Sequence, residues 1–358
     1  MNATAAAHAG GGGNAAASGD AAAPMPEALL RVGGLRVEFG ARAALCDVTF
    51  DLFAGECLGL VGESGSGKST LARAILRLVH ASRGSVEFLG KDLLTCDAST
   101  LRGLRRNLQL VFQDPPASLN PRMTIGQAIA EPLRIFEPNL AARACRDRVG
   151  AMLARVGLDA DMMGRYPHEF SGGQCQRIGI ARAMILNPRL LICDEPVSSL
   201  DVSIQGQIVN LLLDLQRDMG TAMLFISHNL ALVRHMCRRI LVMYSGRIVE
   251  IAPRDALFAA PVHPYTRALL AAVPSPTPLP RSARRGAEPP EVAAAANAAA
   301  AAKAAAAAGV AGALRSAAAA GCVFRERCGY ATAVCATVPP LEEVTPGHWA
   351  ACHHARDL

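Results

Sequence analysis

The feature that most constrains this chain is an apolar run, a glycine-rich loop and a helix-forming run that follow one another directly. The run CLGLVG (57–62) is typical of a buried strand, and STLARAILRLV (69–79) has apolar residues at helical spacing. Between them, GESGSGKST (62–70) matches G-x-x-x-x-G-K-[ST] in the context that this pattern requires. Such a loop surrounds an anion with backbone amides at the start of a helix. A glycine turn without function is disfavoured because pattern and context agree.

The residues of this loop predict a nucleotide phosphate site. Lysine is rare in the chain, since the basic residues are nearly all arginine, and a compact ammonium at Lys68 suits a crowded site better than a broad guanidinium. We expect Lys68 to reach the β- and γ-phosphates of ATP and Ser69 to bind Mg²⁺. The predicted nucleotide-binding residues here are Gly62, Glu63, Ser64, Gly65, Ser66, Gly67, Lys68, Ser69 and Thr70.

A second apolar run ends in two carboxylates. In LLICDEP (190–196) the strand places Asp194 and Glu195 at the carboxyl edge of the sheet, where α/β proteins bind ligands. We expect Asp194 to hold Mg²⁺ directly or through water, and Glu195 to orient and polarise an attacking water. A solvated turn is the alternative, and the phosphate loop makes it the weaker one.

The rest of the pattern indicates an α/β core with a mostly parallel sheet, because strands alternate with helices. Short alternating runs between residues 29 and 53 predict antiparallel strands. Further strands are expected at 107–112, 190–193 and 222–227, and helices at 124–136, 141–156, 204–219 and 230–238.

Composition limits the partners and the compartment. The net charge of +6 is mild and the basic residues are scattered, so we expect no nucleic-acid partner. The first 20 residues lack the charges and apolar core of a signal peptide, and no stretch has the twenty strongly apolar residues of a spanning helix. A cytosolic chain with eleven cysteines favours free thiols or metal ligands over disulfides.

Several further motifs resemble those of the ATP-binding cassette superfamily. SGGQ (171–174), which follows Phe170 where the family more often has leucine, is similar to its signature motif. Gln113 in VFQDP resembles the Q-loop glutamine, SSLD (198–201) the D-loop, and His228 in FISHN the switch histidine. The resemblance implies a P-loop ATPase cassette with a mostly parallel core sheet, an antiparallel β subdomain and an α-helical signature subdomain.

The resemblance also assigns roles to residues. Glu195, His228 and Gln113 would be catalytic, and Gln113 would join Ser69 and Asp194 at Mg²⁺. Phe39 would stack on adenine, with a core position as the alternative. Two cassettes pack head to tail in this family, so that Ser171 and Gly173 donate to the γ-phosphate held by the partner. The residues expected at this second nucleotide surface are Ser171, Gly172, Gly173, Gln174 and Asp201.

A narrower resemblance covers roughly residues 29–274 and the tail. FQDPPASLNPRMTIGQAIAEPL (112–133), RYPHEFSGGQCQRIGIARA (165–183) and HPYTRALLAAVP (263–274) are similar to ATP-binding subunits of bacterial oligopeptide and dipeptide importers, most of all the second, F-type, of the two paired ATPases. This implies a second ATPase, two transmembrane permeases contacted by the segment after Gln113, an extracytoplasmic solute-binding protein, and a peripheral place on the cytoplasmic face of the inner membrane. An importer of nickel or another small solute is the alternative.

Two soluble classes of the superfamily are less compatible with the sequence. Chromosome-type repair ATPases insert a long coiled coil between phosphate loop and signature, and Lys68 and Ser171 are too close for one. Translation-type members carry two cassettes in a chain, and only one phosphate loop is present here. One departure concerns Asn229, which stands where peptide-importer ATPases usually carry aspartate. Because His228 is retained, we expect hydrolysis to persist, at a rate that this difference could alter.

The expected organisation has five parts. They are a disordered Ala/Gly tail (1–26), the ATPase domain (27–255), a peptide-importer extension (256–285), a Pro/Ala-rich linker (286–320) and a four-cysteine tail (321–358).

The four-cysteine tail carries a separate prediction. The spacing of Cys322, Cys328, Cys335 and Cys352 is weak evidence for a metal site, because it lacks the short pairs of zinc ribbons. The tail resembles that of importer ATPases in which four cysteines can hold a [4Fe–4S] cluster, and Arg325 and Arg327 would then offset its negative charge. Unligated thiols and zinc are the alternatives. The remaining cysteines, Cys57 and Cys193 among them, are expected to be buried residues.

Overall fold

The computed structural model describes residues 27–272 and 321–358. The predicted Ala/Gly tail (1–26), the linker (286–320) and the end of the expected extension (273–285) lie outside these described residues. Within the described ranges no helix is both long enough and apolar enough to pass through a bilayer.

An eight-stranded sheet forms the centre of the molecule, in the order β11-β12-β10-β9-β3-β8-β7-β6. The five strands β9, β3, β8, β7 and β6 are parallel to one another, which confirms the predicted mostly parallel core. Their apolar runs are covered on both faces, and every residue of β3, β7 and β8 is buried. The bounds are β3 Cys57–Val61, β6 Leu108–Val111, β7 Leu190–Asp194, β8 Ala222–Ile226 and β9 Arg239–Tyr244.

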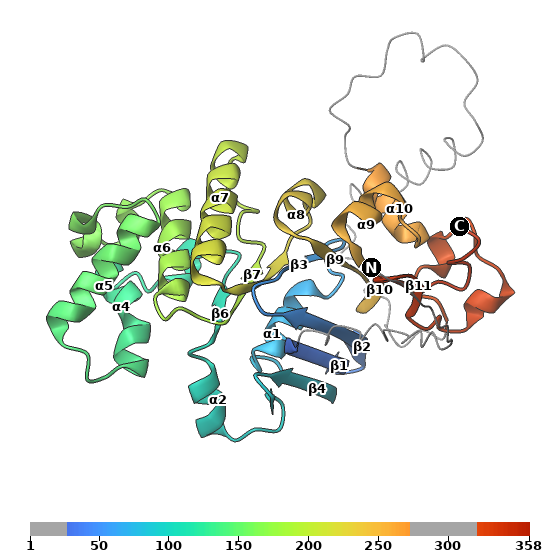
Figure 1. Ribbon diagram of the computed structural model, residues 1–358, viewed down its shortest axis with the longest axis horizontal. Coiled ribbons are helices and arrows are strands. Elements are labelled where there is room, and N and C mark those ends of the chain that lie inside the picture. The colour runs from blue at the N-terminus through green and yellow to red at the C-terminus, as the bar shows by residue number, and fades with distance from the viewer. Residues whose placement is uncertain (1–26, 273–320) are drawn as a thin grey trace, which may run out of the picture.

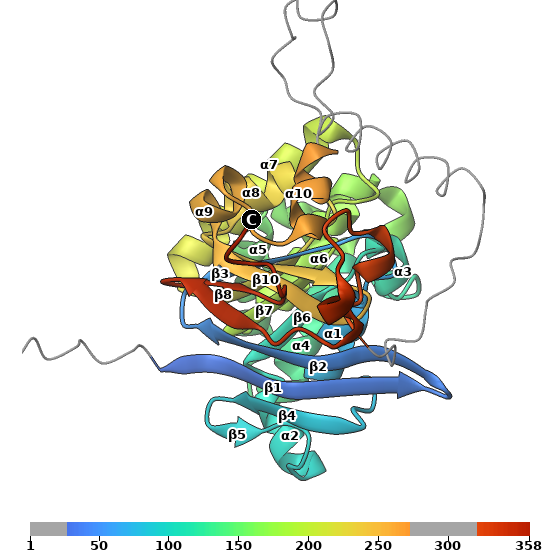
Figure 2. The same ribbon diagram turned by 90° about the vertical axis from the view of Figure 1, so that its right-hand side faces the viewer.

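A separate antiparallel sheet, in the order β2-β1-β4-β5, lies beside the central one and confirms the predicted antiparallel subdomain (Figure 2). Its strands are β1 Ala28–Phe39, β2 Arg42–Phe53, β4 Arg83–Phe88 and β5 Lys91–Asp92. Helix α1 (Lys68–Ile75) packs between the two sheets, because its apolar residues share one core with the inner faces of both.

Helix α1 ends earlier than its apolar spacing predicts. The sequence pattern continues to residue 79, but Arg77 has a φ of +52°, and the amide of Leu78 donates to the carbonyl of Arg73 at 2.8 Å. This hydrogen bond closes the helix end, so the following apolar residues lead into β4 instead of adding a turn.

A helical lobe projects from one end of the central sheet (Figure 1). Helix α4 contacts α6, α5 and the short turn η1, so the lobe has its own packed interior. The elements of this lobe are α3 Pro115–Ser118, α4 Ile125–Phe136, α5 Ala142–Arg155, η1 Ala160–Gly164, η2 Pro167–Glu169 and α6 Gly172–Met184. Three other helices are α2 Ala98–Leu104, α7 Val202–Met219 and α8 Leu230–Met236.

The C-terminal region joins the edge of the central sheet. Strand β12 (His348–Ala350) pairs antiparallel with β10 (Arg247–Pro253), and β11 (Glu342–Thr345) pairs with β12. The fully buried Glu250 also accepts from Nε2 of His348 at 2.6 Å, which ties the tail to the cassette. The other elements here are α9 Arg254–Ala259, α10 Pro264–Ala271, η4 Arg325–Arg327 and η5 Ala333–Ala336.

Candidate functional site

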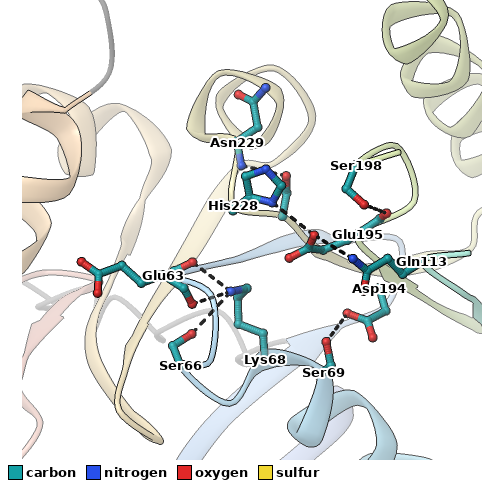
Figure 3. A network of polar contacts seen from close by, with 12 residues as sticks. Glu63, Ser66, Lys68, Ser69, Gln113, Asp194, Glu195, Ser198, His228 and Asn229 are labelled. Carbon is teal, nitrogen blue, oxygen red and sulfur yellow. Dashed lines mark hydrogen bonds and ion pairs between the residues drawn. The ribbon is translucent and has the colours of Figure 1, made fainter. Parts of the chain in front are cut away.

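The phosphate loop runs from the end of β3 to the start of α1 (Figure 3). Glycine is required at two of its positions. A Cβ on Gly62 would overlap the carbonyl oxygen of Met243, and Gly67 has a φ of +109° at the N-cap of α1. Among the residues that the structure describes, no side chain caps this helix start, so its first amides face the loop without a side-chain acceptor. The predicted strand–loop–helix geometry is therefore present.

The side chain of Lys68 folds back and hydrogen-bonds to the phosphate loop. Its ammonium donates to the carbonyl oxygens of Gly62 and Glu63, at 2.9 Å each, and to Oγ of Ser66 at 3.5 Å. Burial lowers the pKa of Lys68, and the nearby carboxylates of Glu195, Asp194 and Glu63 oppose that shift. The ammonium is thus held at the centre of the loop, with acidic groups in electrostatic reach.

Ser69 and Asp194 form a pair of oxygen donors at the start of α1. Oγ of Ser69 donates to Oδ1 of Asp194 at 2.9 Å, and Asp194 is buried at the end of β7. Burial raises the pKa of this carboxyl, and the hydrogen bond from Ser69 opposes the rise. A hydroxyl and a carboxylate in contact are hard oxygen ligands of the kind that Mg²⁺ prefers, so these two residues fit the expected metal.

Two of the three expected catalytic residues converge on the carboxylate of the third, Glu195. Oε2 of Glu195 accepts from Nε2 of Gln113 at 3.4 Å and lies 3.2 Å from Nδ1 of His228 (Figure 3). These side chains follow the ends of β7, β6 and β8, which are adjacent in the sheet. Gln113 therefore contacts Glu195, whereas Ser69 and Asp194 contact each other.

The backbone around Glu195 is unusual. Glu195 has a φ of +48°, its amide donates to the carbonyl of Ile226 at 3.0 Å, and its carbonyl accepts from Oγ of Ser198 at 3.2 Å. A left-handed conformation costs free energy for a residue with a side chain and persists only where the surroundings hold it. Here it turns the carboxylate toward His228.

Asn229 caps helix α8. Its Oδ1 accepts from the amides of Ala231 at 3.0 Å and Leu232 at 3.4 Å. An aspartate would make the same two hydrogen bonds, so Asn229 retains the capping function and removes only a negative charge beside His228.

The signature residues lie at the start of α6, in the helical lobe. Ser171 and Gln174 form a reciprocal capping box, with the Ser171 amide donating to Oε1 of Gln174 at 3.0 Å and the Gln174 amide to Oγ of Ser171 at 3.4 Å. A Cβ on Gly173 would come within 2.8 Å of Ile204, so α7 packs closely there. In the described part of the chain, the side chains of Ser171 and Gln174 each accept from the other residue's backbone amide and do not contact the phosphate loop.

Two expected nucleotide-binding residues stand apart from the loop. Phe39 ends β1 and is 55% exposed, so the alternative that it belongs to the core is wrong. Asp201 occupies the N-cap position of α7, where its side chain makes no capping hydrogen bond.

The cysteines fall into two groups. Cys57 and Cys193 are buried on β3 and β7, as predicted. The four tail thiols come from one packed segment, in which the amide of Cys322 donates to the carbonyl of Cys335 at 3.0 Å. Burial raises the pKa of Cys352, and the charges of Cys322, Cys328 and Cys335 raise it further. As placed, however, no group of three or more His, Cys, Asp or Glu side chains in the described ranges could hold a metal ion.

The structure adds residues that the motifs did not indicate. Arg327 was expected to offset the charge of a cluster, but its guanidinium contacts Glu63 of the phosphate loop instead. Tyr265, inside the quoted HPYT segment, also contacts Glu63. Neither partner lies within 200 residues in sequence, so no local signal could have found them.

Comparisons with known proteins agree with this geometry. Residues 45–198 match the family model described as ABC transporter, and residues 249–335 match the one described as oligopeptide/dipeptide transporter, C-terminal region. The chain is 51% identical over 310 residues to the oligopeptide transport ATP-binding protein OppF of Salmonella typhimurium, with 86% of this chain and 87% of that protein covered. OppF of Escherichia coli is 50% identical over the same shares of each chain. The chain belongs to the ATP-binding subunits of oligopeptide/dipeptide ABC transporters.

Solved structures of ABC cassettes share the fold. The dimeric post-hydrolysis structure of the cassette MJ0796, bound to ADP and Pi, aligns with a TM-score of 0.58 and 26% identity, covering 63% of this chain and 98% of that one. The cassette cbiO1 of Clostridium perfringens gives a TM-score of 0.58 and 27% identity, covering 65% and 91%. The expected cassette fold, ABC ATPase class and resemblance to F-type subunits are thus confirmed.

Proposed function

We propose that this ABC ATPase couples ATP binding and hydrolysis to the uptake of oligopeptides or dipeptides across the cytoplasmic membrane. The observation that carries the proposal is the convergence of Gln113 and His228 on Glu195, beside a complete phosphate loop. The identity to OppF across most of both chains supports the transported class.

In the proposed mechanism the loop amides and Lys68 bind the phosphates of ATP, and Ser69 and Asp194, together with Gln113, would hold Mg²⁺. Bound Mg²⁺ supplies neutralisation of the phosphate charge. Lys68 is held by two carbonyl oxygens, so its ammonium is already oriented before nucleotide arrives. Glu195 orients and polarises the attacking water, and His228 and Gln113 fix the position of that carboxylate.

The second half of the nucleotide site comes from a second ATPase subunit, either a paralogue or another copy of this chain. Ser171 uses its oxygen to cap α6, which leaves its hydroxyl hydrogen free to donate to a phosphate held by the partner. The amides of Gly172 and Gly173, in the first turn of α6, point the same way. The dimeric form of the related cassette MJ0796 supports this arrangement.

Two permease subunits and an extracytoplasmic solute-binding protein complete the proposed transporter, with this chain peripheral on the cytoplasmic face. The helical lobe supplies a surface for a permease, since Ile135 of α4 is exposed there and a hollow of about 540 Å³ lies between α4 and α5. Phe112, directly after β6, is exposed as well.

The direct test is transport by the whole complex. Membrane vesicles that contain the permeases, the binding protein and both ATPases should take up a labelled oligopeptide only with ATP inside, and Lys68→Ala in this chain should abolish uptake. Uptake of nickel but not of peptide would support the nickel alternative and contradict the peptide assignment.

We also propose that the four-cysteine tail takes up a [4Fe–4S] cluster, for which the sulfurs would have to draw closer than in the structure. Four free thiol groups from one tail, with the backbones of Cys322 and Cys335 hydrogen-bonded at 3.0 Å, support this donor set. Protein purified without oxygen should be brown and contain iron and sulfide, and a Cys335→Ala variant should lose both. A colourless protein without iron would contradict the cluster.

A further inference from the structure

Glu63, the second residue of the phosphate loop, is held mainly by the C-terminal region of the chain. Its amide donates to Oη of Tyr265 at 2.9 Å. Its carboxylate accepts two hydrogen bonds from Arg327, at 3.0 and 3.1 Å. Its carbonyl accepts from Lys68. All three polar groups of this residue are therefore occupied, two of them from segments more than 200 residues away.

The guanidinium of Arg327 makes a two-pronged pair with this carboxylate. Nη1 bonds Oε2 and Nη2 bonds Oε1 of Glu63, so the plane of the fork matches the plane of the carboxylate. Nη1 also donates to Oη of Tyr244 at 3.3 Å, and the guanidinium lies 5.5 Å from the ring of Phe324. These contacts orient Arg327 although its side chain is 42% exposed.

An aromatic cluster packs against Tyr265 and Arg327, the two residues that contact Glu63. The rings of Tyr244, Tyr265 and Phe324 lie within 4.6 to 5.5 Å of one another and come from β9, α10 and the tail. Tyr265 and Phe324 are buried, so packing fixes the position of the Tyr265 hydroxyl relative to the loop. The tail thus completes, through Phe324, the aromatic cluster that contacts the start of the phosphate loop.

The charge of Glu63 makes this contact matter for nucleotide. A carboxylate beside an anion-binding loop repels phosphate unless a cation neutralises it. The Glu63 carboxylate is close enough to influence Lys68, which lies at the centre of the loop. Arg327 is the cation that the structure places on that carboxylate.

We propose that Arg327 and Tyr265 are positioning residues that attach the C-terminal region to the phosphate loop and strengthen its affinity for ATP. Arg327 neutralises and orients the Glu63 side chain, and Tyr265 orients the Glu63 backbone. This inference rests on the proposed ATPase function, because it concerns the same nucleotide site.

The test measures binding of a non-hydrolysable ATP analogue to the full chain by titration calorimetry. Arg327→Gln should weaken binding about threefold to tenfold, which is the size expected when one charge-assisted pair is lost. In a Glu63→Gln background the same change should alter binding by less than about twofold, because no carboxylate is left to neutralise. Tyr265→Phe, which keeps the ring, should weaken binding in the same direction as Arg327→Gln.

Arg325→Gln is the matched control, because it removes an arginine from the same turn, η4, that does not contact Glu63. It should bind as the wild type does. Equal binding by Arg327→Gln and the wild type, or an equal loss in the Glu63→Gln background, would overturn the inference. If Arg327→Gln fails to fold, Arg327→Lys keeps the charge, loses the fork, and should show an intermediate loss. A wild type that binds no nucleotide would contradict the proposed function instead.

Discussion

Helices α1 and α6 both start at glycine-rich segments, but they differ in how their N-termini are capped. Helix α1 begins at Gly67, which adopts a left-handed conformation and provides no side-chain cap. Helix α6 begins at Ser171, which is extended and forms a complete capping box with Gln174. One helix start is left open to an anion, and the other is partly closed by its own side chains.

The difference shows how similar glycine-rich patterns can serve separate halves of a site. At α1 the ammonium of Lys68 and the uncapped amides face the same loop, so this half is organised within one chain. At α6 the box satisfies the Gln174 amide and fixes the position of the Ser171 oxygen. A hydroxyl held in place, with its hydrogen still free to donate, suits the proposed role toward a second subunit.

The strongest test of this comparison removes the ammonium from the α1 half. Lys68→Ala should weaken ATP binding by about 100-fold or more, because charge-assisted hydrogen bonds to phosphate are lost. Equilibrium dialysis measures the effect. Lys91→Ala, which removes an exposed lysine from β5, is the control and should bind normally. Unchanged binding by Lys68→Ala would show that the loop is not the phosphate site.

A second test separates binding from turnover. Glu195→Gln keeps the shape of the side chain but weakens its interaction with the attacking water, so hydrolysis should fall by about 100-fold or more with ATP affinity retained. Steady-state phosphate release and size-exclusion chromatography with ATP measure turnover and dimer formation. The variant should accumulate as a dimer, and ordinary hydrolysis would reject the assigned role.

A third test concerns the α6 half, and the chain offers a matched control. Ser171→Ala and Thr124→Ala each destroy a capping box, on α6 and α4, so each should lose about 1 kcal/mol of stability. Only Ser171→Ala should also slow hydrolysis, by about tenfold or more, because only it removes a donor to the partner's phosphate. Thermal unfolding and phosphate release distinguish the two effects. If both variants slowed hydrolysis equally, Ser171 would act only as a helix cap and not as a donor to the partner's phosphate.

The smallest effect is expected at Asn229. Asn229→Asp retains both capping hydrogen bonds and adds a negative charge at the start of α8, for a gain of about 0.3–1 kcal/mol in stability. Hydrolysis should change by less than about threefold, since His228 still contacts Glu195. Thermal unfolding and turnover measure both. A much larger rise in turnover would show that asparagine limits the wild-type rate.

The parts of the site predictable from sequence depend on neighbours in the chain. The strand, loop and helix around Lys68, and the carboxylates after β7, follow from patterns within about ten residues. The end of α1 was misjudged because apolar spacing continued past Ile75, whereas the backbone turns at Arg77. Here a local hydrogen bond overrode the periodic pattern.

The parts that sequence could not predict depend on distant partners. The family resemblance places Arg327 beside a cysteine-bound cluster, but its partner in the structure is Glu63, 264 residues earlier. The pairing of β12 with β10 is also remote in sequence, since Glu250 pairs with Ala350. Any of several carboxylates could have matched this arginine in charge, and only the packing of the tail against the sheet edge selects one.

The sequence alone therefore determined the chemistry of the nucleotide site, because loop amides, Lys68 and the carboxylates are placed by short-range rules of strand, turn and helix. Tertiary structure decided what holds that site from outside: Gln113 and His228 meet at Glu195 only because their strands are neighbours in the sheet. The tail reaches Glu63 only because β12 extends the same sheet. Contacts between segments so far apart depend on how the whole core packs, which no short stretch of sequence encodes.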